Sequence, residues 1–262
     1  MKHLILTRFN VGLYNLYKSS IKEYRKIITV PSRCGYMTKK LTIIKEDDKK
    51  YEPLQWMVDR KKIFLNYCYK SIINQTEKDF EWLIFFDKET PVKELAFYKG
   101  LENDNIKIFI TNEKKLKKER LEIIKKILLQ NKNDYVITTR LDNDDSLHKN
   151  FVLITKIMAK KMLGIWELPF AINFPIGYCH DTINKETRLS PFEESNPFIS
   201  VVEKSNMDIK TVLQGQHLSI SNKMNTKQVI EDIHYWIRII HKHNVSNRMP
   251  SGSKVKISKS FF

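Results

Sequence analysis

The sequence is poor in cysteine. Cys34, Cys68 and Cys179 are its three cysteines, they lie far apart, and no CxxC motif occurs. An odd number of widely spaced cysteines favours neither a disulfide framework nor a zinc knuckle. The cysteine content therefore fits the reducing cytoplasm, where thiols stay free.

Long hydrophobic runs are missing as well. No stretch approaches the ~18 apolar residues that a membrane-spanning helix needs. The first eight residues, MKHLILTR, contain an apolar run that is three residues long and ends before Arg8. That run is shorter than the hydrophobic region of a signal peptide. We therefore expect neither a membrane span nor a secretory leader.

The sequence also lacks internal repeats and linkers. Its 262 residues are enough to bury a substantial core, and its 42% hydrophobic content is typical of a globular protein. We predict a single domain over residues 1–262. Its first half, to about residue 145, is an ordered α/β unit, and the half from about residue 146 is rich in loops and ends in a basic tail.

Basic residues dominate the charge. Lys and Arg outnumber Asp and Glu by 46 to 30, a net charge of +16. Such an excess suits nucleic acid, an anionic membrane surface or a phosphorylated substrate. The lysines are scattered, and no RRM, KH or zinc-finger signature occurs, so we expect no nucleic-acid partner. A Mg²⁺-dependent nucleic-acid enzyme stays open as an alternative, because acidic metal sites also serve nucleases.

Apolar runs and helical periodicity alternate in the first half. Nearly continuous apolar runs are typical of strands buried on both faces of a parallel sheet. They occupy residues 3–9, 81–86, 106–111 and 135–141. Residues 59–75 and 115–131 repeat apolar side chains at helical spacing between some of these runs. The alternation predicts an α/β fold with right-handed crossovers.

The remaining segments are less regular. Residues 36–53 are polar and charged, and we interpret them as a long loop or a small excursion from the sheet. A helix is expected over 150–163 and a short helix over 200–204. Residues 228–243 carry aromatics and histidines in a helical or extended stretch.

Three carboxylates follow the run 135–141 within four residues. They belong to Asp142, Asp144 and Asp145, and Asp87 follows the run 81–86 in the same way. Carboxylates this close repel each other unless a cation lies among them. Because ligands of open α/β sheets bind beyond the carboxyl ends of the strands, the pattern predicts a Mg²⁺ or Mn²⁺ site there. The structural alternative is a solvated acidic turn in which Asp145 caps the next helix.

Several segments taken in order carry a resemblance. They are LILTRFN at 4–10, a helix with Trp56, Arg60, Phe64, Cys68, Ser71 and Gln75, FEWLIFFD at 80–87 with Thr90 and Pro91, TRLDNDD at 139–145 with Leu147, His148, Phe151 and Val152, and the late Trp236, His241 and Asn244. This ordered set resembles the GT-A glycosyltransferases, and most nearly the bacterial rhamnosyltransferase family. The resemblance covers most of the chain.

The resemblance implies a fold and an activity. The fold is a GT-A-like three-layer α/β/α sandwich around a mostly parallel twisted sheet. The activity is metal-dependent transfer of a sugar, rhamnose by the family's name, from a nucleotide-diphosphate donor to a glycan or lipid-linked glycan acceptor in the synthesis of a bacterial surface polysaccharide such as a capsule. Mn²⁺ or Mg²⁺ is the implied cofactor. A module that kept the fold without activity is the other alternative.

The resemblance also implies roles for individual residues. The donor-binding residues are Thr7, Arg8, Asn10, Arg60, Asp87, Arg140 and Asp142. The metal ligands are Asp144, Asp142 and His241. Asp144 is expected to bind the metal directly, and Asp142 to face the sugar or ribose. A guanidinium group binds phosphate oxygens through two parallel hydrogen bonds, so Arg8, Arg60 and Arg140 suit the diphosphate. Arg60 equally suits a helix-surface ion pair with Asp59 or a neighbour.

The acceptor side needs a general base and surfaces for sugar rings. Glu203 is the first choice for the base, with Glu167, Asp181 and His217 as alternatives. An exposed Glu203 paired with Lys204 is the competing interpretation. The residues expected to stack on the acceptor are Trp166, Phe170, Tyr178 and Trp236, most of which a core role explains equally well.

The basic charge and the tail from Lys254 to Phe261 and Phe262 suggest a further partner. Polybasic segments bind the anionic inner leaflet, where lipid-linked glycan acceptors lie. We therefore expect a cytoplasmic enzyme that is peripheral on this leaflet.

Overall fold

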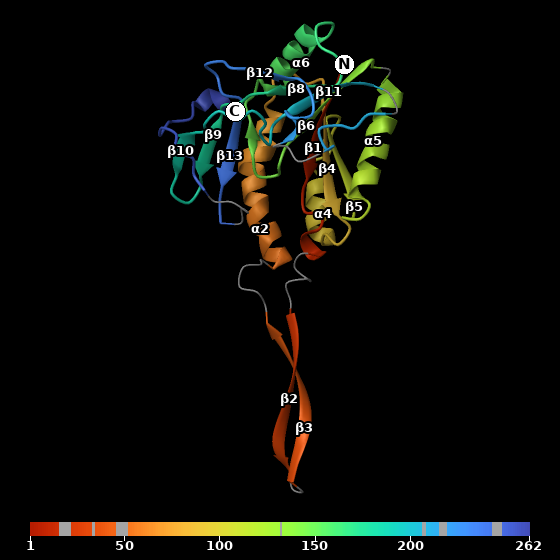
Figure 1. Ribbon diagram of the computed structural model, residues 1–262, viewed down its shortest axis with the longest axis vertical. Helices are drawn as coiled ribbons and strands as arrows, with labels where there is room; N and C mark the ends of the chain where they lie inside the picture. The colour runs from red at the N-terminus through yellow and green to blue at the C-terminus, as the bar shows by residue number, and fades with distance from the viewer. Residues whose placement is uncertain are drawn as a thin grey trace.

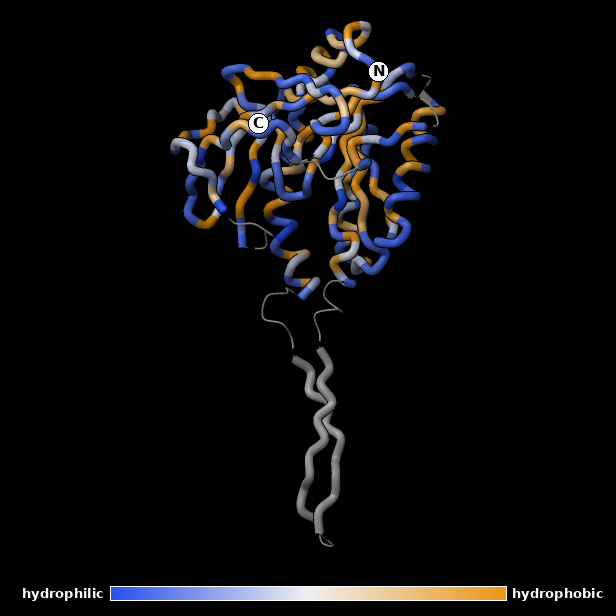
Figure 2. Tube along the Cα trace, viewed as in Figure 1, coloured by the Kyte–Doolittle hydropathy of each residue, from blue (hydrophilic) through white to orange (hydrophobic). Residues whose placement is uncertain are grey.

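The computed structural model describes residues 1–15, 22–32, 35–45, 52–131, 133–205, 208–214, 219–242 and 248–262. Figure 1 shows a body of α and β layers and a separate two-stranded hairpin. Hydrophobic residues concentrate along the strands of the central sheet, as Figure 2 shows. Burial of these strands on both faces is the main source of the core.

A seven-stranded sheet forms the centre of the body, in the order β12-β8-β11-β6-β1-β4-β5. Its strands are β1 (Lys2–Arg8), β4 (Glu81–Asp87), β5 (Ile106–Thr111), β6 (Tyr135–Arg140), β8 (Phe170–Asn173), β11 (Ser200–Lys204) and β12 (Thr226–Gln228). β6, β1, β4 and β5 run parallel, and β12 runs parallel to β8. Only β11 is antiparallel to its neighbours β6 and β8. The four apolar runs of the first half are strands, as predicted, and the sheet is mostly parallel.

Helices cover both faces of this sheet. On one face lie α2 (Pro53–Ile63), a π-helical turn (Phe64–Tyr69) that continues into α3 (Lys70–Ile73), α4 (Val92–Lys99) and α6 (Phe151–Met162). On the other face lies α5 (Leu116–Asn131). β1 serves both cores, because Ile5 packs toward α2 and its neighbours Leu4 and Leu6 pack toward α5. The three-layer α/β/α prediction is therefore confirmed.

A smaller sheet completes the body, in the order β10-β9-β13-β7. Its strands are β7 (Ser146–Leu147), β9 (Tyr178–Asp181), β10 (Glu186–Leu189) and β13 (Trp236–Ile240). Residues 142–145, which carry Asp142, Asp144 and Asp145, form a turn that we call the acidic turn. β7 follows it directly and pairs with β13, with Trp236 opposite Leu147 and Ile237 opposite Ser146. This pairing carries the end of the chain back to the edge where β6 ends.

The structure corrects two predictions that were made from local pattern, those for residues 200–204 and 36–53. Residues 200–204 form the strand β11 and not a helix, because they are hydrogen-bonded on both sides and their two valines favour a pleated, buried surface. The excursion predicted over 36–53 is found in part: β3 (Gly35–Lys45) pairs with β2 (Lys22–Ser32) in an antiparallel hairpin with Lys22 opposite Lys45, whereas residues 46–51 lie outside the described residues and α2 begins at Pro53. The hairpin pairs with no strand of the two other sheets described.

The C-terminal segment is part of the body. Phe261 is 3% exposed, its ring lies 5.2 Å from that of His148, and its carbonyl accepts a hydrogen bond of 2.9 Å from Lys149 N. The prediction that the end of the tail binds a membrane is therefore wrong for Phe261, because a ring buried in this way is not available to lipid. Among the described residues, no helix combines the length and the apolar character that crossing a bilayer requires.

Phe261→Ala should lower the free energy of unfolding by about 3 kcal/mol, because it removes a buried ring and leaves a cavity. Phe192→Ala is the matched control, since Phe192 is 49% exposed and should change stability little. Urea unfolding followed by circular dichroism measures both. Equal stability of the two variants would mean that Phe261 is not anchored in solution.

Candidate functional site

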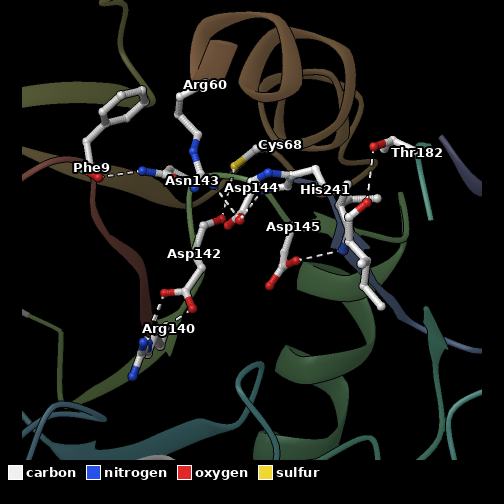
Figure 3. A network of polar contacts seen from close by, with 12 residues as sticks. Phe9, Arg60, Cys68, Arg140, Asp142, Asn143, Asp144, Asp145, Thr182 and His241 are labelled. Atoms are coloured by element: carbon white, nitrogen blue, oxygen red, sulfur yellow. Dashed lines mark hydrogen bonds and ion pairs between the residues drawn. The ribbon is translucent and has the colours of Figure 1, made fainter. Parts of the chain in front are cut away.

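The acidic turn directs its three carboxylates to three different partners, as Figure 3 shows. The turn is closed by a hydrogen bond of 3.3 Å from Asp145 N to the carbonyl of Asp142. The side chains of Asp142, Asp144 and Asp145 then point apart. This divergence reduces the repulsion that three carboxylates in four residues would otherwise create.

Asp142 pairs with the arginine that precedes it. Its Oδ1 accepts hydrogen bonds from Arg140 Nη2 at 3.0 Å and from Arg140 Nε at 3.2 Å. Both side chains are about one-third exposed. The carboxylate of Asp142 thus lies at the surface, on a fork of charged donors, where a ligand can reach it.

Asp144 lies in a buried cluster with two cationic or potentially cationic groups. Its Oδ2 contacts Arg60 Nη1 in an ion pair and His241 Nε2 at 2.9 Å. Arg60 is 5% exposed and stacks over the ring of Trp56 at 4.7 Å. Burial opposes ionisation of Asp144, but Arg60 and then His241 outweigh it and hold the pKa of this carboxyl below its ordinary value. Asp144 is therefore ionised.

The alternative role of Arg60, a surface ion pair with Asp59, is wrong. Asp59 instead pairs with Lys242 at 2.8 Å. Arg60 turns inward because α2 packs its buried face on the sheet, and it also donates from Nη1 to Asn143 Oδ1 at 2.9 Å. Sequence reasoning missed Asn143, which additionally donates to the carbonyl of Phe9 and so ties the acidic turn to the loop after β1.

Asp145 does not cap a helix, so that prediction is wrong. β7 begins at the next residue, and the residue at the N-terminal cap of α6 is Asn150. Asp145 Oδ1 accepts a hydrogen bond of 2.9 Å from Ile239 N, which joins the turn to β13. Burial, followed by the charges of Asp144 and Asp142, raises the pKa of Asp145 well above its ordinary value.

The loop after β1 is held by Asp87. Its Oδ2 accepts from Gly12 N at 2.8 Å, and its own N–H donates to Asn10 Oδ1 at 2.9 Å. Asn10 Nδ2 donates in turn to Thr90 Oγ1 at 2.9 Å. Asp87 therefore lies at the sheet edge, as predicted from the strand order, and Asn10, which the resemblance placed at the donor, lies beside it; both are engaged in shaping the loop.

Thr7 is a structural residue of the sheet. Its hydroxyl donates to the carbonyl of Leu141 at 2.7 Å and accepts from Trp82 Nε1 at 2.8 Å. The side chain is fully buried. Because both functions of the hydroxyl are used inside the core, Thr7 does not contact a donor as the resemblance implied.

The acidic turn and His241 supply only some of the ligands that a divalent ion needs. In the part of the chain that the structure describes, no three His, Cys, Asp or Glu side chains converge as metal ligands. Asp144 Oδ2 and His241 Nε2 are 2.9 Å apart, a hydrogen-bond distance, and the same oxygen also pairs with Arg60, whereas Asp142 points away to Arg140. Mg²⁺ commonly binds one or two side chains and completes its shell with phosphate oxygens and water. Asp144 and His241 would be the two side-chain ligands of such an ion, which would have to replace Arg60 on Asp144 Oδ2.

Comparison with known proteins assigns the family. Residues 29–253 match the model of the family described as "Putative rhamnosyl transferase". The chain belongs to this family. A comparison with curated proteins found no match.

Matches among solved structures include three of S. aureus TarS. Residues 1–349 of TarS give a TM-score of 0.45 at 11% identity, covering 91% of this chain and 60% of that one. The same region in complex with UDP gives 0.43 at 11% identity, covering 92% and 61%. A third TarS structure gives 0.43 at 11% identity, covering 92% and 37%. The chain thus spans about three-fifths of the first two TarS chains.

Two of the predicted bases of this rhamnosyl transferase family member, Glu203 and Glu167, lie at the edge of the sheet opposite to the acidic turn. Glu203 is opposite Val136, six residues before Asp142, or roughly 20 Å along the strand direction at about 3.3 Å per residue. Its carboxylate accepts from Lys210 N at 2.9 Å and Thr211 N at 2.7 Å, and burial raises its pKa. It is therefore a buried loop anchor, neither the base nor an exposed helix acid. Glu167 is exposed and precedes β8 at the same far edge.

Asp181 is the predicted base that lies nearest to the acidic turn. It ends β9 opposite Ile240, the residue before His241. Its Oδ1 accepts from Ile183 N at 2.8 Å and Asn184 N at 3.1 Å, and its Oδ2 accepts from Asn184 Nδ2 at 2.7 Å. Burial opposes its ionisation, but the hydrogen bonds from Asn184 and Ile183 lower its pKa. His217 lies outside the described residues.

The four aromatic residues predicted to stack on the acceptor differ in how deeply they are buried. Trp236 is 1% exposed, stacks on Phe198 at 4.7 Å and donates from Nε1 to the carbonyl of Phe174, so it is a core residue and not an acceptor surface. Phe170 is likewise fully buried. Trp166 is half-buried against Phe170 at the far edge of the sheet. Tyr178 is half-buried at the start of β9 and remains a candidate for sugar stacking.

Glu203→Gln should leave donor binding within about twofold of the unchanged protein, because the side chain is remote from the acidic turn. It should cost about 1–3 kcal/mol of stability, since a single amide oxygen cannot reproduce both carboxylate contacts. Titration with a sugar nucleotide and urea unfolding measure the two effects. Loss of donor binding at unchanged stability would restore Glu203 to the active site.

Glu203 should also leave a signature in the pH dependence of stability. Its raised pKa means that the folded protein binds this proton more tightly than the unfolded chain. Its contribution is therefore greatest below the ordinary carboxyl pKa and is lost as the pH rises through the folded value. Unfolding of Glu203→Gln across this range should show a smaller fall in stability than the unchanged protein, and parallel curves would contradict the assignment.

Proposed function

We propose that this protein is a glycosyltransferase that moves a sugar, rhamnose in keeping with its family, from a nucleotide-diphosphate donor to a hydroxyl of a glycan or lipid-linked glycan. The observation that carries the proposal is the pairing at one sheet edge of a surface carboxylate, Asp142, with a buried ionised carboxylate, Asp144, beside His241. This arrangement separates a group that can bind hydroxyls from a group that can hold a cation. Synthesis of a bacterial surface polysaccharide such as a capsule is the proposed setting.

The chemistry requires neutralisation of the leaving diphosphate. As the bond from sugar to phosphate breaks, negative charge grows on the diphosphate, and fixed positive groups lower the barrier. Arg140 is accessible at the edge of the sheet and offers a fork of donors to phosphate oxygens. A bound Mg²⁺ or Mn²⁺ on Asp144 and His241 would add positive charge at the same group.

The other residues hold these groups in position. Arg60 and Asn143 fix the turn from the α2 side, and Ile239 N fixes Asp145 from the β13 side. The turn is therefore preorganised before a ligand binds, which avoids a cost of reorganisation during the reaction. Asp142 is the group we assign to a sugar or ribose hydroxyl. Asp181 is the base candidate that we retain, because β9 places it opposite Ile240, the residue before His241.

Asp144→Asn should abolish metal-dependent donor binding, because it removes the charge that His241 and Arg60 face. A panel of sugar nucleotides with different bases and sugars is screened by thermal shift with and without Mn²⁺, since a ligand that binds the folded state raises the melting temperature. We expect one donor to raise it by several degrees and Asp144→Asn to lose at least tenfold in affinity. Asp104→Asn is the matched control, since Asp104 is an exposed loop residue.

Unchanged donor binding by Asp144→Asn would refute the assigned role. No response to any sugar nucleotide, with or without Mn²⁺, would argue for a fold that has lost its activity. The same screen therefore separates the enzyme from the non-catalytic module. It also identifies the donor.

We further propose that the protein associates peripherally with the anionic inner leaflet of the cytoplasmic membrane. Its net charge of +16 supports this proposal, whereas the buried Phe261 does not. Co-sedimentation should be strong with anionic vesicles, weak with neutral vesicles, and lost as salt screens the charges. Equal partition to both kinds of vesicle, or to neither, would contradict it.

A further inference from the structure

A hollow lies on the α5 face of the sheet, away from the acidic turn. It has a volume of about 360 Å³ and lies between the first half of α5 and the segment 209–214. It is lined by Lys117, Arg120, Leu121, Ile124, Ile209, Lys210, Thr211, Leu213 and Gln214. Among the described lining residues three side chains are cationic and none is a carboxylate, so this part of the hollow has the electrostatics of an anion site.

Two hydrogen-bond donors in the lining lack a partner. Arg120 Nε and Gln214 Nε2 are buried and make no hydrogen bond within the part of the chain that the structure describes. A buried donor without an acceptor costs free energy, and a donor on a charged group costs more. Such groups are expected where a ligand supplies the acceptors.

Arg120 also lies among other arginines. Arg8 and Arg140 end β1 and β6, and both lie on the α5 face, because Arg8 pairs with Phe85 and Arg140 with Leu6, which belong to the core under α5. Burial, followed by the charges of Arg8 and Arg140, lowers the pKa of Arg120 to about 10. Asp142 offsets the charge of Arg140. Arg120 is thus a partly buried cation repelled by its neighbours.

The wall opposite Arg120 is held rigidly. Glu203 accepts from the backbone N–H groups of Lys210 and Thr211, and Thr138 Oγ1 accepts from Val212 N at 2.8 Å. Thr211 adopts a φ of +65°, a left-handed conformation that side chains with a branched β-carbon rarely take. Glu203 thus anchors this wall from outside the lining of the hollow, through backbone N–H groups that a glutamine can still meet in part.

We propose that this hollow binds a phosphoryl group, with Arg120 as its main contact and Lys117 and Lys210 as supporting cations. A guanidinium and two ammonium groups suit a doubly charged oxyanion with several acceptor oxygens. The volume of about 360 Å³ leaves room for a phosphoryl group that is part of a larger molecule. Two sources share this chemistry, the diphosphate of the donor and a phosphate on the acceptor. The proposal that the hollow binds a phosphoryl group does not depend on sugar transfer. The assignment of that group to the donor or to the acceptor rests on the proposed function.

Isothermal titration with inorganic pyrophosphate and with glucose 1-phosphate tests the proposal. Arg120→Gln should weaken the affinity for at least one probe tenfold or more. Lys118→Gln is the matched control, because it removes the same charge from the same helix at a side chain that is 83% exposed, and it should change affinity less than twofold. Equal affinities of the two variants for both probes would overturn the proposal.

Binding of a second ligand shows whether the phosphoryl group belongs to the donor or to the acceptor. If the phosphoryl group belongs to the donor, Arg120→Gln also loses the thermal shift by the sugar nucleotide, and pyrophosphate competes with that nucleotide. If it belongs to the acceptor, glucose 1-phosphate still binds the protein saturated with sugar nucleotide, and Arg120→Gln loses this binding. Either result supports the site.

Stability separates a binding role from a structural one. Arg120→Gln relieves repulsion by Arg8 and Arg140, so its melting temperature should equal or exceed that of the unchanged protein, and Arg120→Lys should keep part of the affinity. A lower melting temperature with unchanged phosphate affinity would make Arg120 a structural residue and overturn the proposal. Asp144→Asn should leave glucose 1-phosphate binding intact, so a failure of the transferase proposal is distinguishable from a failure of this one.

Discussion

Repulsion among the three carboxylates of one turn is the constraint on which the rest of the structure depends. Asp142, Asp144 and Asp145 lie within four residues, and each is balanced from a different part of the chain: by Arg140 at the end of β6, by Arg60 from α2 with His241, and by a backbone N–H of β13. Buried carboxylates are costly unless each has a partner. The turn therefore holds together the central sheet, the α2 layer and the smaller sheet.

The same turn divides the functional edge into two sides. Asp144 and its partners face α2 and β13, a buried environment suited to a cation. Asp142 and Arg140 face α5, a more exposed environment that continues into the arginines Arg8 and Arg120. A diphosphate placed over the turn meets positive charge on both sides. This division gives each carboxylate different partners and a different degree of burial although the residues are almost adjacent in sequence.

Three of the predictions that were wrong share a cause. Glu203, Trp236 and Asp145 were assigned from local pattern, yet each position depends on a strand partner that is far away in sequence. Glu203 is placed at the far edge by the antiparallel pairing of β11 with β6. Trp236 is buried because β13 pairs with β7, and Asp145 is turned inward by the same pairing. A helix-like segment of five residues cannot reveal such pairings, because strand and helix preferences are weak over so short a length.

The sequence by itself determined the four parallel strands, the main helices and the presence of acidic groups at one sheet edge, because continuous apolar runs and helical periodicity are local properties of a buried α/β core. The resemblance added His241 to that edge. Only the tertiary structure decided which carboxylate is buried, which arginine neutralises it, and that Arg120 joins Arg8 and Arg140 on the α5 face. Those outcomes depend on register and on packing between residues that can be more than a hundred positions apart, and the burial and charge of a side chain are set by such neighbours rather than by its own place in the sequence.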